Sequence, residues 1–145
     1  VVEETMKTKP VLAIGVGMQA LMQHSEENGG VDCLGLLPRQ VRYFGNELVD
    51  SQGAKLKVPH MGWNTVQQTI DHPLWQGIEQ NSRFYFVHSY YVDAVHNPNV
   101  SGTCDYGSDF AAALSYNNLV AVQFHPEKSA DAGRKLLRNF WHWMG

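Results

Sequence analysis

Residues 10–22 read PVLAIGVGMQALM, and this stretch decides the fold. Pro10 opens a short, continuous apolar run, which is typical of a strand buried on both faces, as in parallel sheets. The turn Gly15-Val16-Gly17 follows directly, and Met18–Met22 has the composition of a helix. We therefore predict a strand, a tight turn and a helix over residues 10–24.

The turn itself is a candidate site. A buried strand that turns sharply into a helix places its turn residue at the top of the sheet, as in the nucleophile elbow of hydrolases. Backbone N–H groups at the start of such a helix can stabilise an oxyanion. A hydrolase would carry Ser or Cys at the turn, whereas this chain carries Gly15. From this window alone, an ordinary tight turn is the favoured interpretation.

Further apolar and aromatic segments predict a sheet with an antiparallel middle portion. The expected strands are 41–44, 55–58, 84–92, 101–106, 110–115 and 119–124, with a turn at residues 117–118. We expect helix over residues 1–8 and 130–144, with Ser129 or Asp131 as a cap of the second helix. One α/β domain over residues 1–145 accounts for this order of elements.

The composition excludes several classes of protein. The chain has 145 residues, 43% of them hydrophobic, and a net charge of −3, so it is not disordered. It has no Lys/Arg run for nucleic-acid binding and no apolar stretch near the ~20 residues of a membrane span. Two cysteines, Cys33 and Cys104, are too few for a disulfide framework and favour a reducing, cytoplasmic location. The seven histidines show no metal-ligand spacing, so no metal site is expected.

The stretch QFHPE, residues 123–127, follows an expected buried strand. A carboxylate beside an imidazole can fix its tautomer and favour the imidazolium, which is the base half of a catalytic triad. His125 and Glu127 have the residue types for this chemistry. The alternative is a histidine at a strand end with an exposed glutamate.

Two further stretches carry polar side chains between aromatic residues. PHMGWN, residues 59–64, would be a loop that offers polar groups to a ligand or partner, or else a hairpin connection with a core Trp63. HSYY, residues 88–91, closes the strongest expected strand, and its imidazole and hydroxyls suit a small zwitterion. The alternative there is a strand end whose polar groups are satisfied within the protein.

These windows, in this order, resemble the glutaminase subunit of imidazole glycerol phosphate synthase, a class I (triad-type) glutamine amidotransferase family of histidine biosynthesis. The matching windows are PVLAIGVGMQ (10–19), SEE (25–27), LGL (34–36), PHMGWN (59–64), LWQGI (74–78), FYFVHSYYV (84–92), YG (106–107), QFHPEKS (123–129) and LLRNF (136–140). PHMGWN together with FYFVHSYYV points to this subunit in particular. The resemblance covers nearly the whole chain and implies a flavodoxin-like mixed sheet flanked by helices.

The resemblance implies hydrolysis of glutamine to glutamate and ammonia, without a cofactor. The ammonia would pass to a (β/α)8 cyclase subunit as partner. His125 would be the general base and acid, and Glu127 its orienting carboxylate. Gly15 stands at the position of the nucleophile, and Val16 would supply one oxyanion N–H from its backbone.

The resemblance also implies two groups of binding residues. The residues that fall where the family holds substrate glutamine are Gln19, His88, Ser89 and Tyr90. The residues expected toward the cyclase interface and the ammonia path are His60, Met61, Gly62, Trp63 and Asn64.

The chain departs from the family pattern in two places. The family elbow reads Gly-Ile-Cys-Leu-Gly with Cys as nucleophile, whereas residues 13–17 read Ala-Ile-Gly-Val-Gly, and Gly15 has no side chain to form a thioester. The family also has a preceding segment of strands, a helix and a Pro-Gly-x-Gly loop with no counterpart before Val1. We therefore expect an N-terminally incomplete domain with an open sheet edge.

Two classes of function stay open at this point. One is a glutaminase subunit whose hydrolysis is impaired because the nucleophile is missing. The other is a non-catalytic module that binds glutamine or the cyclase and serves as a scaffold. A third, weaker possibility is a relative that acts in another amidotransferase pathway.

Overall fold

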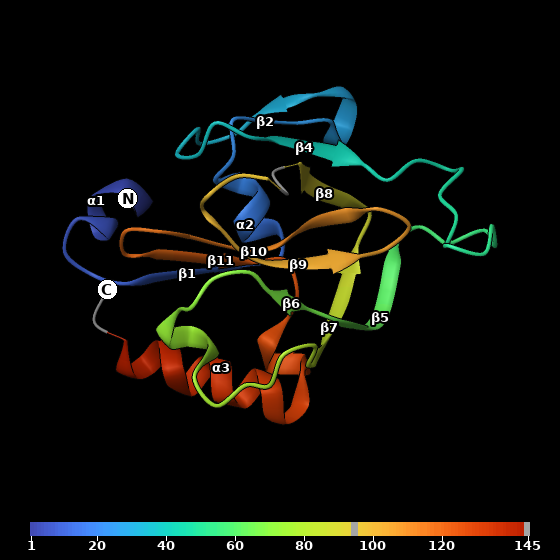
Figure 1. Cartoon of the computed structure of the whole chain (residues 1–145). Coiled ribbons are helices and arrows are strands. Elements are labelled where there is room, and N and C mark those ends of the chain that lie inside the picture. The colour runs from blue at the N-terminus through green and yellow to red at the C-terminus, as the bar shows by residue number, and fades with distance from the viewer. Residues whose placement is uncertain (94–95, 144–145) are drawn as a thin grey trace.

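The structure is a computed structural model that describes residues 1–93 and 96–143 (Figure 1). The helices are α1 (Val2–Met6), α2 (Val16–Ala20) and α3 (Ala130–His142). The strands are β1 (Val11–Ile14), β2 (His24–Ser25), β3 (Val31–Asp32), β4 (Gln40–Tyr43), β5 (His60–Thr65), β6 (Gln67–Gln68), β7 (Arg83–His88), β8 (Tyr90–Asp93), β9 (Val100–Asp105), β10 (Asp109–Tyr116) and β11 (Leu119–Val122). Single 3-10 turns lie at Glu27–Gly29, Pro73–Trp75 and Pro126–Lys128.

The main sheet is mixed. Its strand order is β1-β11-β10-β8-β4-β2-β3, with β9 on β10 and β6 on β9. The first pair, β1 and β11, is parallel, and β10 pairs antiparallel with β11, β8 and β9. The expected α/β class with a mixed sheet and an antiparallel middle portion is therefore confirmed.

Both faces of the sheet are covered near β11, where all four residues are buried. Leu119 and Ala121 pack with Met18 of α2 and with Met22 just after it, whereas Val120 and Val122 pack in a second cluster with Leu136 of α3. Successive strand residues point to opposite faces, so α2 and α3 lie on opposite sides of β11 (Figure 1). This two-sided burial explains why residues 119–122 are uniformly apolar rather than alternating.

One edge of the main sheet is β1. Among the described residues β1 pairs only with β11 and stands at the end of the strand order. Its four residues are only half-buried, in contrast to those of β11.

None of the described helices is long and apolar enough to cross a membrane.

The long aromatic segment 84–92 is not one strand, contrary to expectation. It forms β7 and β8, which are separated by Ser89. The reason is that β7 pairs with β5 in a separate two-stranded sheet, whereas β8 pairs with β4 and β10 in the main sheet. The chain therefore crosses from one sheet to the other at Ser89.

Other expectations differ in detail. The strand expected over 55–58 is wrong, because in the described structure Lys55 forms only an isolated bridge with Val49. The expected strand 119–124 ends at Val122. The expected final helix forms over Ala130–His142, and position 144 lies outside the described residues.

Candidate active site

Gly15 joins β1 to α2 in a sharp turn. Its φ of 58° and ψ of −117° lie in a region that L side chains rarely adopt. Its N–H donates to Val122 O at 2.8 Å, and its carbonyl accepts the Met18 N–H at 3.0 Å. The turn is thus fixed to β11 on one side and to the first turn of α2 on the other, as in a nucleophile elbow.

His125 and Glu127 form a close pair just beyond β11. The imidazole Nδ1 lies 2.7 Å from Glu127 Oε1. An ionised carboxylate only accepts, so Nδ1 carries a proton, and in the neutral imidazole Nε2 is then an acceptor. The His125 N–H donates to Tyr85 O at 2.9 Å, which fixes the backbone against β7.

The elbow and the histidine meet despite their separation in the sequence. A Cβ atom built on Gly15 would lie 3.2 Å from His125 Nε2 and 3.3 Å from Cε1. The direction of a side chain at residue 15 is therefore toward the basic nitrogen of the imidazole. This is the arrangement in which a histidine takes a proton from a nucleophile.

Ser129, which the sequence predicted only as a possible helix cap, and Gly133 hold this segment in place. Ser129 accepts the Tyr85 N–H at 2.9 Å and donates to His125 O at 2.6 Å. Its hydroxyl therefore does not cap α3, although Ser129 occupies the cap position. A Cβ on Gly133 would lie 1.9 Å from Pro126 O, so a glycine lets α3 approach the turn after His125. The available signal was their position after QFHPE, with Ser129 two residues and Gly133 six residues beyond Glu127.

Gln19 points into the protein from α2. Its Nε2 donates to Tyr90 O at 2.9 Å and to Gln123 Oε1 at 2.9 Å. Gln19 is nearly buried, and Gln123 is fully buried. Both amide hydrogens of Gln19 are therefore used within the protein, which leaves its Oε1 as the atom available to a ligand. Gln123, which the sequence reasoning did not assign to the site, sets this orientation.

His88 and His60 are buried next to each other. His88 Nδ1 lies 2.8 Å from Tyr90 O, and His88 Nε2 lies 3.0 Å from His60 Nδ1. Burial, and secondly the charge on a protonated His88, lower the pKa of His60 to about 3. Burial lowers the pKa of His88 to about 4, against the opposing effect of the Tyr90 carbonyl and with a smaller lowering by His125. Both imidazoles are therefore neutral at neutral pH.

The β5 residues expected at the cyclase interface point in two directions. Within β5 the side chains alternate, so His60 and Asn64 face inward whereas Met61 and Trp63 are 62% and 49% exposed. Trp63 is therefore not a core residue, and its ring lies 6.1 Å from that of Tyr85 across the β5–β7 pair. Gly62, between the two exposed side chains, has a φ of 131°.

The resemblance places Ser89 at the substrate glutamine and Val16 at the oxyanion. Ser89 is half-buried, and its carbonyl accepts the Phe44 N–H at 3.1 Å. The Val16 side chain is exposed, and its N–H belongs to the first turn of α2, where a helix offers no partner of its own. The role of this N–H at an oxyanion stays a prediction.

Neither cysteine lies at the elbow: Cys33 follows β3 and Cys104 lies in β9. Burial raises the pKa of the Cys104 thiol to about 12, so this group stays protonated. Cys33 lies beyond the polar, glycine-rich loop that follows α2. Within residues 1–93 and 96–143, no three His, Cys, Asp or Glu side chains are grouped to hold a metal ion.

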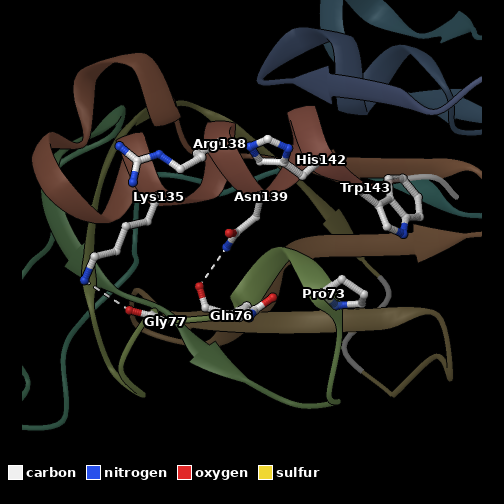
Figure 2. A pocket seen from close by; sticks show the side chains of 8 residues that line it. All are labelled: Pro73, Gln76, Gly77, Lys135, Arg138, Asn139, His142 and Trp143. Carbon is white, nitrogen blue, oxygen red and sulfur yellow. Dashed lines mark hydrogen bonds between the residues drawn. The ribbon is translucent and has the colours of Figure 1, made fainter.

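A pocket of about 640 Å3 lies elsewhere, between α3 and the loop that follows the Pro73–Trp75 turn (Figure 2). Asn139 donates to Leu74 O and Gln76 O at 2.8 Å, and Lys135 donates to Gly77 O at 3.1 Å. These bonds fix the loop to the helix, and basic groups in the last turns of a helix also complement its dipole. The polar side chains of this pocket are therefore explained by their role in fixing the loop to α3.

Comparisons with known proteins show the family of this chain. The family "Glutamine amidotransferase class-I" matches residues 1–143. This chain belongs to that family. The imidazole glycerol phosphate synthase subunit HisH of Pseudomonas putida is 59% identical over 144 residues, which are 99% of this chain and 68% of that protein. HisH of Neisseria gonorrhoeae is 53% identical, over 98% of this chain and 66% of that protein.

Within this glutamine amidotransferase family the chain is thus similar to HisH subunits along nearly its whole length. Solved structures support the same fold. A glutamine amidotransferase of Thermotoga maritima matches with a TM-score of 0.59 at 20% identity, over 97% of this chain and 50% of that chain. The glutaminase domain of Trypanosoma brucei CTPS matches with a TM-score of 0.59 at 18% identity, over 91% and 60%. The chain spans about half to three fifths of these two structures.

Proposed function

We propose that this chain is a HisH-type glutaminase subunit that holds glutamine beside Gly15 and His125, and that its hydrolysis step is impaired. The observation that carries the proposal is the position of His125. Its Nε2 lies 3.2 Å from a Cβ built on residue 15, while its Nδ1 is bonded to Glu127. The histidine and carboxylate of a triad therefore lie beside a residue, Gly15, that has no nucleophilic side chain.

The chemistry follows from this geometry. In the family reaction a thiol at residue 15 loses its proton to the histidine and its sulfur attacks the carboxamide carbon. The proton then moves to the departing ammonia, and water later hydrolyses the thioester. Gly15 cannot form the carbon–sulfur bond. Loss of the nucleophile in a serine protease lowers kcat by about 10⁶, so only slow hydrolysis is expected here.

The proposed partner is a (β/α)8 cyclase subunit, and the proposed compartment is the reducing cytoplasm. The names of the relatives describe a synthase subunit, and β5 offers the exposed Met61 and Trp63 for docking. Exposed, adjacent apolar side chains of this kind are typical of protein interfaces. The ammonia would pass to this partner.

A second candidate function is favoured by Gly15 itself. A non-catalytic module would keep the glutamine site and the partner surface while lacking hydrolysis. Such a chain would bind the cyclase and glutamine, and free ammonia would support the synthase reaction in its place. A thiol introduced at residue 15 would restore glutamine hydrolysis in an impaired glutaminase but not in a binding module.

The test measures glutamate release from glutamine by Gly15→Cys, by Gly15→Ala and by the parent chain, each with a cyclase subunit present. Gly15→Ala carries the same backbone strain without a thiol, so it is the matched control. We expect Gly15→Cys to exceed both by about 10³ or more. A folded Gly15→Cys chain that binds glutamine but releases no glutamate would contradict the impaired glutaminase and favour the binding module.

A further inference from the structure

A chain of hydrogen bonds runs from β5 to α2 through the buried imidazoles of His60 and His88. It begins at Asn64, passes through His60 and His88, and ends at the Tyr90 carbonyl, which also accepts from Gln19. Every proton position along the chain can be worked out, because both of its ends are fixed by backbone groups.

The Asn64 end sets one direction. Asn64 Oδ1 accepts the Thr65 N–H at 2.8 Å, and Asn64 Nδ2 donates to Asp105 O at 3.0 Å. These two bonds leave no freedom to exchange the amide oxygen and nitrogen. The second hydrogen of Nδ2 lies toward His60 Nε2, 3.2 Å away. His60 Nε2 must therefore accept, and the proton of neutral His60 lies on Nδ1.

The Tyr90 end independently indicates the same proton position on His60. A carbonyl oxygen can only accept, so His88 Nδ1 carries a proton. Neutral His88 then has a bare Nε2, which needs a donor. The atom facing it at 3.0 Å is His60 Nδ1, which carries the proton of His60 because His60 Nε2 accepts from Asn64. All donors therefore point from Asn64 toward Tyr90.

Packing keeps the His60 ring in this orientation. The ring is stacked on Tyr106 with centroids 3.9 Å apart and on Phe86 with centroids 4.9 Å apart. His60 is only 3% exposed. Rotation of the ring would break its bonds within an apolar, aromatic surrounding, which is costly for an unpaired polar group.

We propose that His60 is a positioning residue that, through His88, fixes the Tyr90 carbonyl and so directs the Gln19 amide. Tyr90 O receives one hydrogen from His88 and one from Gln19. The second Gln19 hydrogen goes to Gln123, so Gln19 Oε1 is presented as an acceptor. An acceptor at this place selects a ligand group that carries N–H hydrogens. The inference rests on the proposed function in so far as that ligand is glutamine.

The first measurement needs neither a variant nor a ligand. Side-chain 15N NMR of the parent chain distinguishes the two histidine tautomers. We expect the proton on Nδ1 in both His60 and His88 at neutral pH. A proton on Nε2 of either residue would overturn the proposal, whatever the chain is found to bind.

The second measurement uses a matched pair of variants. His60→Leu removes the donor to His88, whereas the amide of His60→Asn can place an N–H near the former Nδ1. We expect glutamine binding, followed by calorimetry, to weaken about tenfold in His60→Leu and to recover most of this loss in His60→Asn. Tenfold corresponds to about 1.4 kcal/mol, within the usual worth of one hydrogen bond.

The outcomes separate this inference from the proposed function. Equal losses in His60→Leu and His60→Asn would assign His60 a merely structural role and refute the positioning role. If the parent chain binds no glutamine, the proposed function fails instead. The amide resonances of Gln19 then serve as the readout, and they should shift in His60→Leu and return toward the parent positions in His60→Asn.

Discussion

Gly15 has a backbone conformation that only glycine adopts without strain, and its missing side chain would point at His125. Gly15→Ala should therefore destabilise the fold by about 1–3 kcal/mol, through the positive φ and a 3.2 Å approach to Nε2. Urea unfolding measures this cost. Gly53→Ala is the control, because Gly53 also has a positive φ but no atom within 4 Å of a built Cβ. A smaller cost at residue 15 than at residue 53 would contradict the argument.

Glu127 acts on His125 rather than on a ligand, through its 2.7 Å bond to Nδ1. In a Gly15→Cys chain, Glu127→Ala should lower the rate of glutamate release by about 10²–10⁴, because the imidazole loses the partner that fixes its tautomer. The KM for glutamine should change little. Steady-state kinetics separate the two constants, and a change confined to KM would show that Glu127 serves binding instead.

At the scale of elements, the contact between α3 and the Pro126–Lys128 turn depends on one missing methyl group. Alanine is the better helix former by about 1 kcal/mol, so Gly133→Ala would be stabilising on propensity alone. The built Cβ, however, lies 1.9 Å from Pro126 O. We expect a loss of about 1–3 kcal/mol instead, together with displacement of the His125 segment.

A matched control for this prediction lies in α2. Gly17 is also helical, and a Cβ there would meet only Ala13 Cβ at 3.8 Å. Gly17→Ala should therefore be neutral or stabilising. Thermal unfolding of both variants decides the point, and destabilisation of equal size in the two would show that α3 does not depend on Gly133.

The exposed face of β5 carries the prediction about the partner. Trp63→Ala should weaken binding of a cyclase subunit by 2 kcal/mol or more, about 30-fold, because buried tryptophans dominate interfaces. Trp141→Ala is the control, because Trp141 is also exposed, at 83%, but lies on α3. Surface plasmon resonance with the cyclase immobilised compares the two, and equal effects would remove β5 from the interface.

The elements that the sequence predicted well are those with strong local signals. PVLAIGVG predicted the strand and turn at Gly15, although β1 is only half-buried rather than buried on both faces. The apolar run in residues 119–124 predicted β11, which is buried on both faces and ends at Val122. The break at Ser89 could not be predicted in this way. Both halves of 84–92 favour strand, and only their different partners, β5 and β4, divide them.

In the candidate site, too, the sequence predicted residues with local signals but not the pairing of strands. QFHPE predicted the pair His125 and Glu127, and the resemblance placed Gly15 at the nucleophile position. The structure brings these three residues together. The inward direction of His60 depended on the register of β5 against β7, which pairs His60 with His88. Such pairing across the chain is a tertiary feature, and residue types alone do not specify it.

For the molecule as a whole, the buried histidine pair links folding to pH. The pKa values of His60 and His88 are about 3 and 4 in the folded chain, against 6.5 for an ordinary histidine, and burial also lowers the pKa of His72. Below pH 6.5 the unfolded chain therefore binds protons that the folded chain does not. The free energy of unfolding must fall as the pH falls, by up to about 1.4 kcal/mol per pH unit for each such histidine.

We accordingly expect the chain to be stable at pH 7 and to lose stability steadily from pH 6.5 toward pH 4, below which the folded histidines begin to accept protons themselves. Urea unfolding at pH 7, 6 and 5 measures the slope. His60→Asn removes one of the titrating groups while keeping a donor for His88, so it should reduce the slope without abolishing it. A free energy of unfolding that is constant between pH 7 and pH 5 would mean that these imidazoles are not held neutral by the fold, and the hydrogen-bond directions deduced from their neutrality would fall with it.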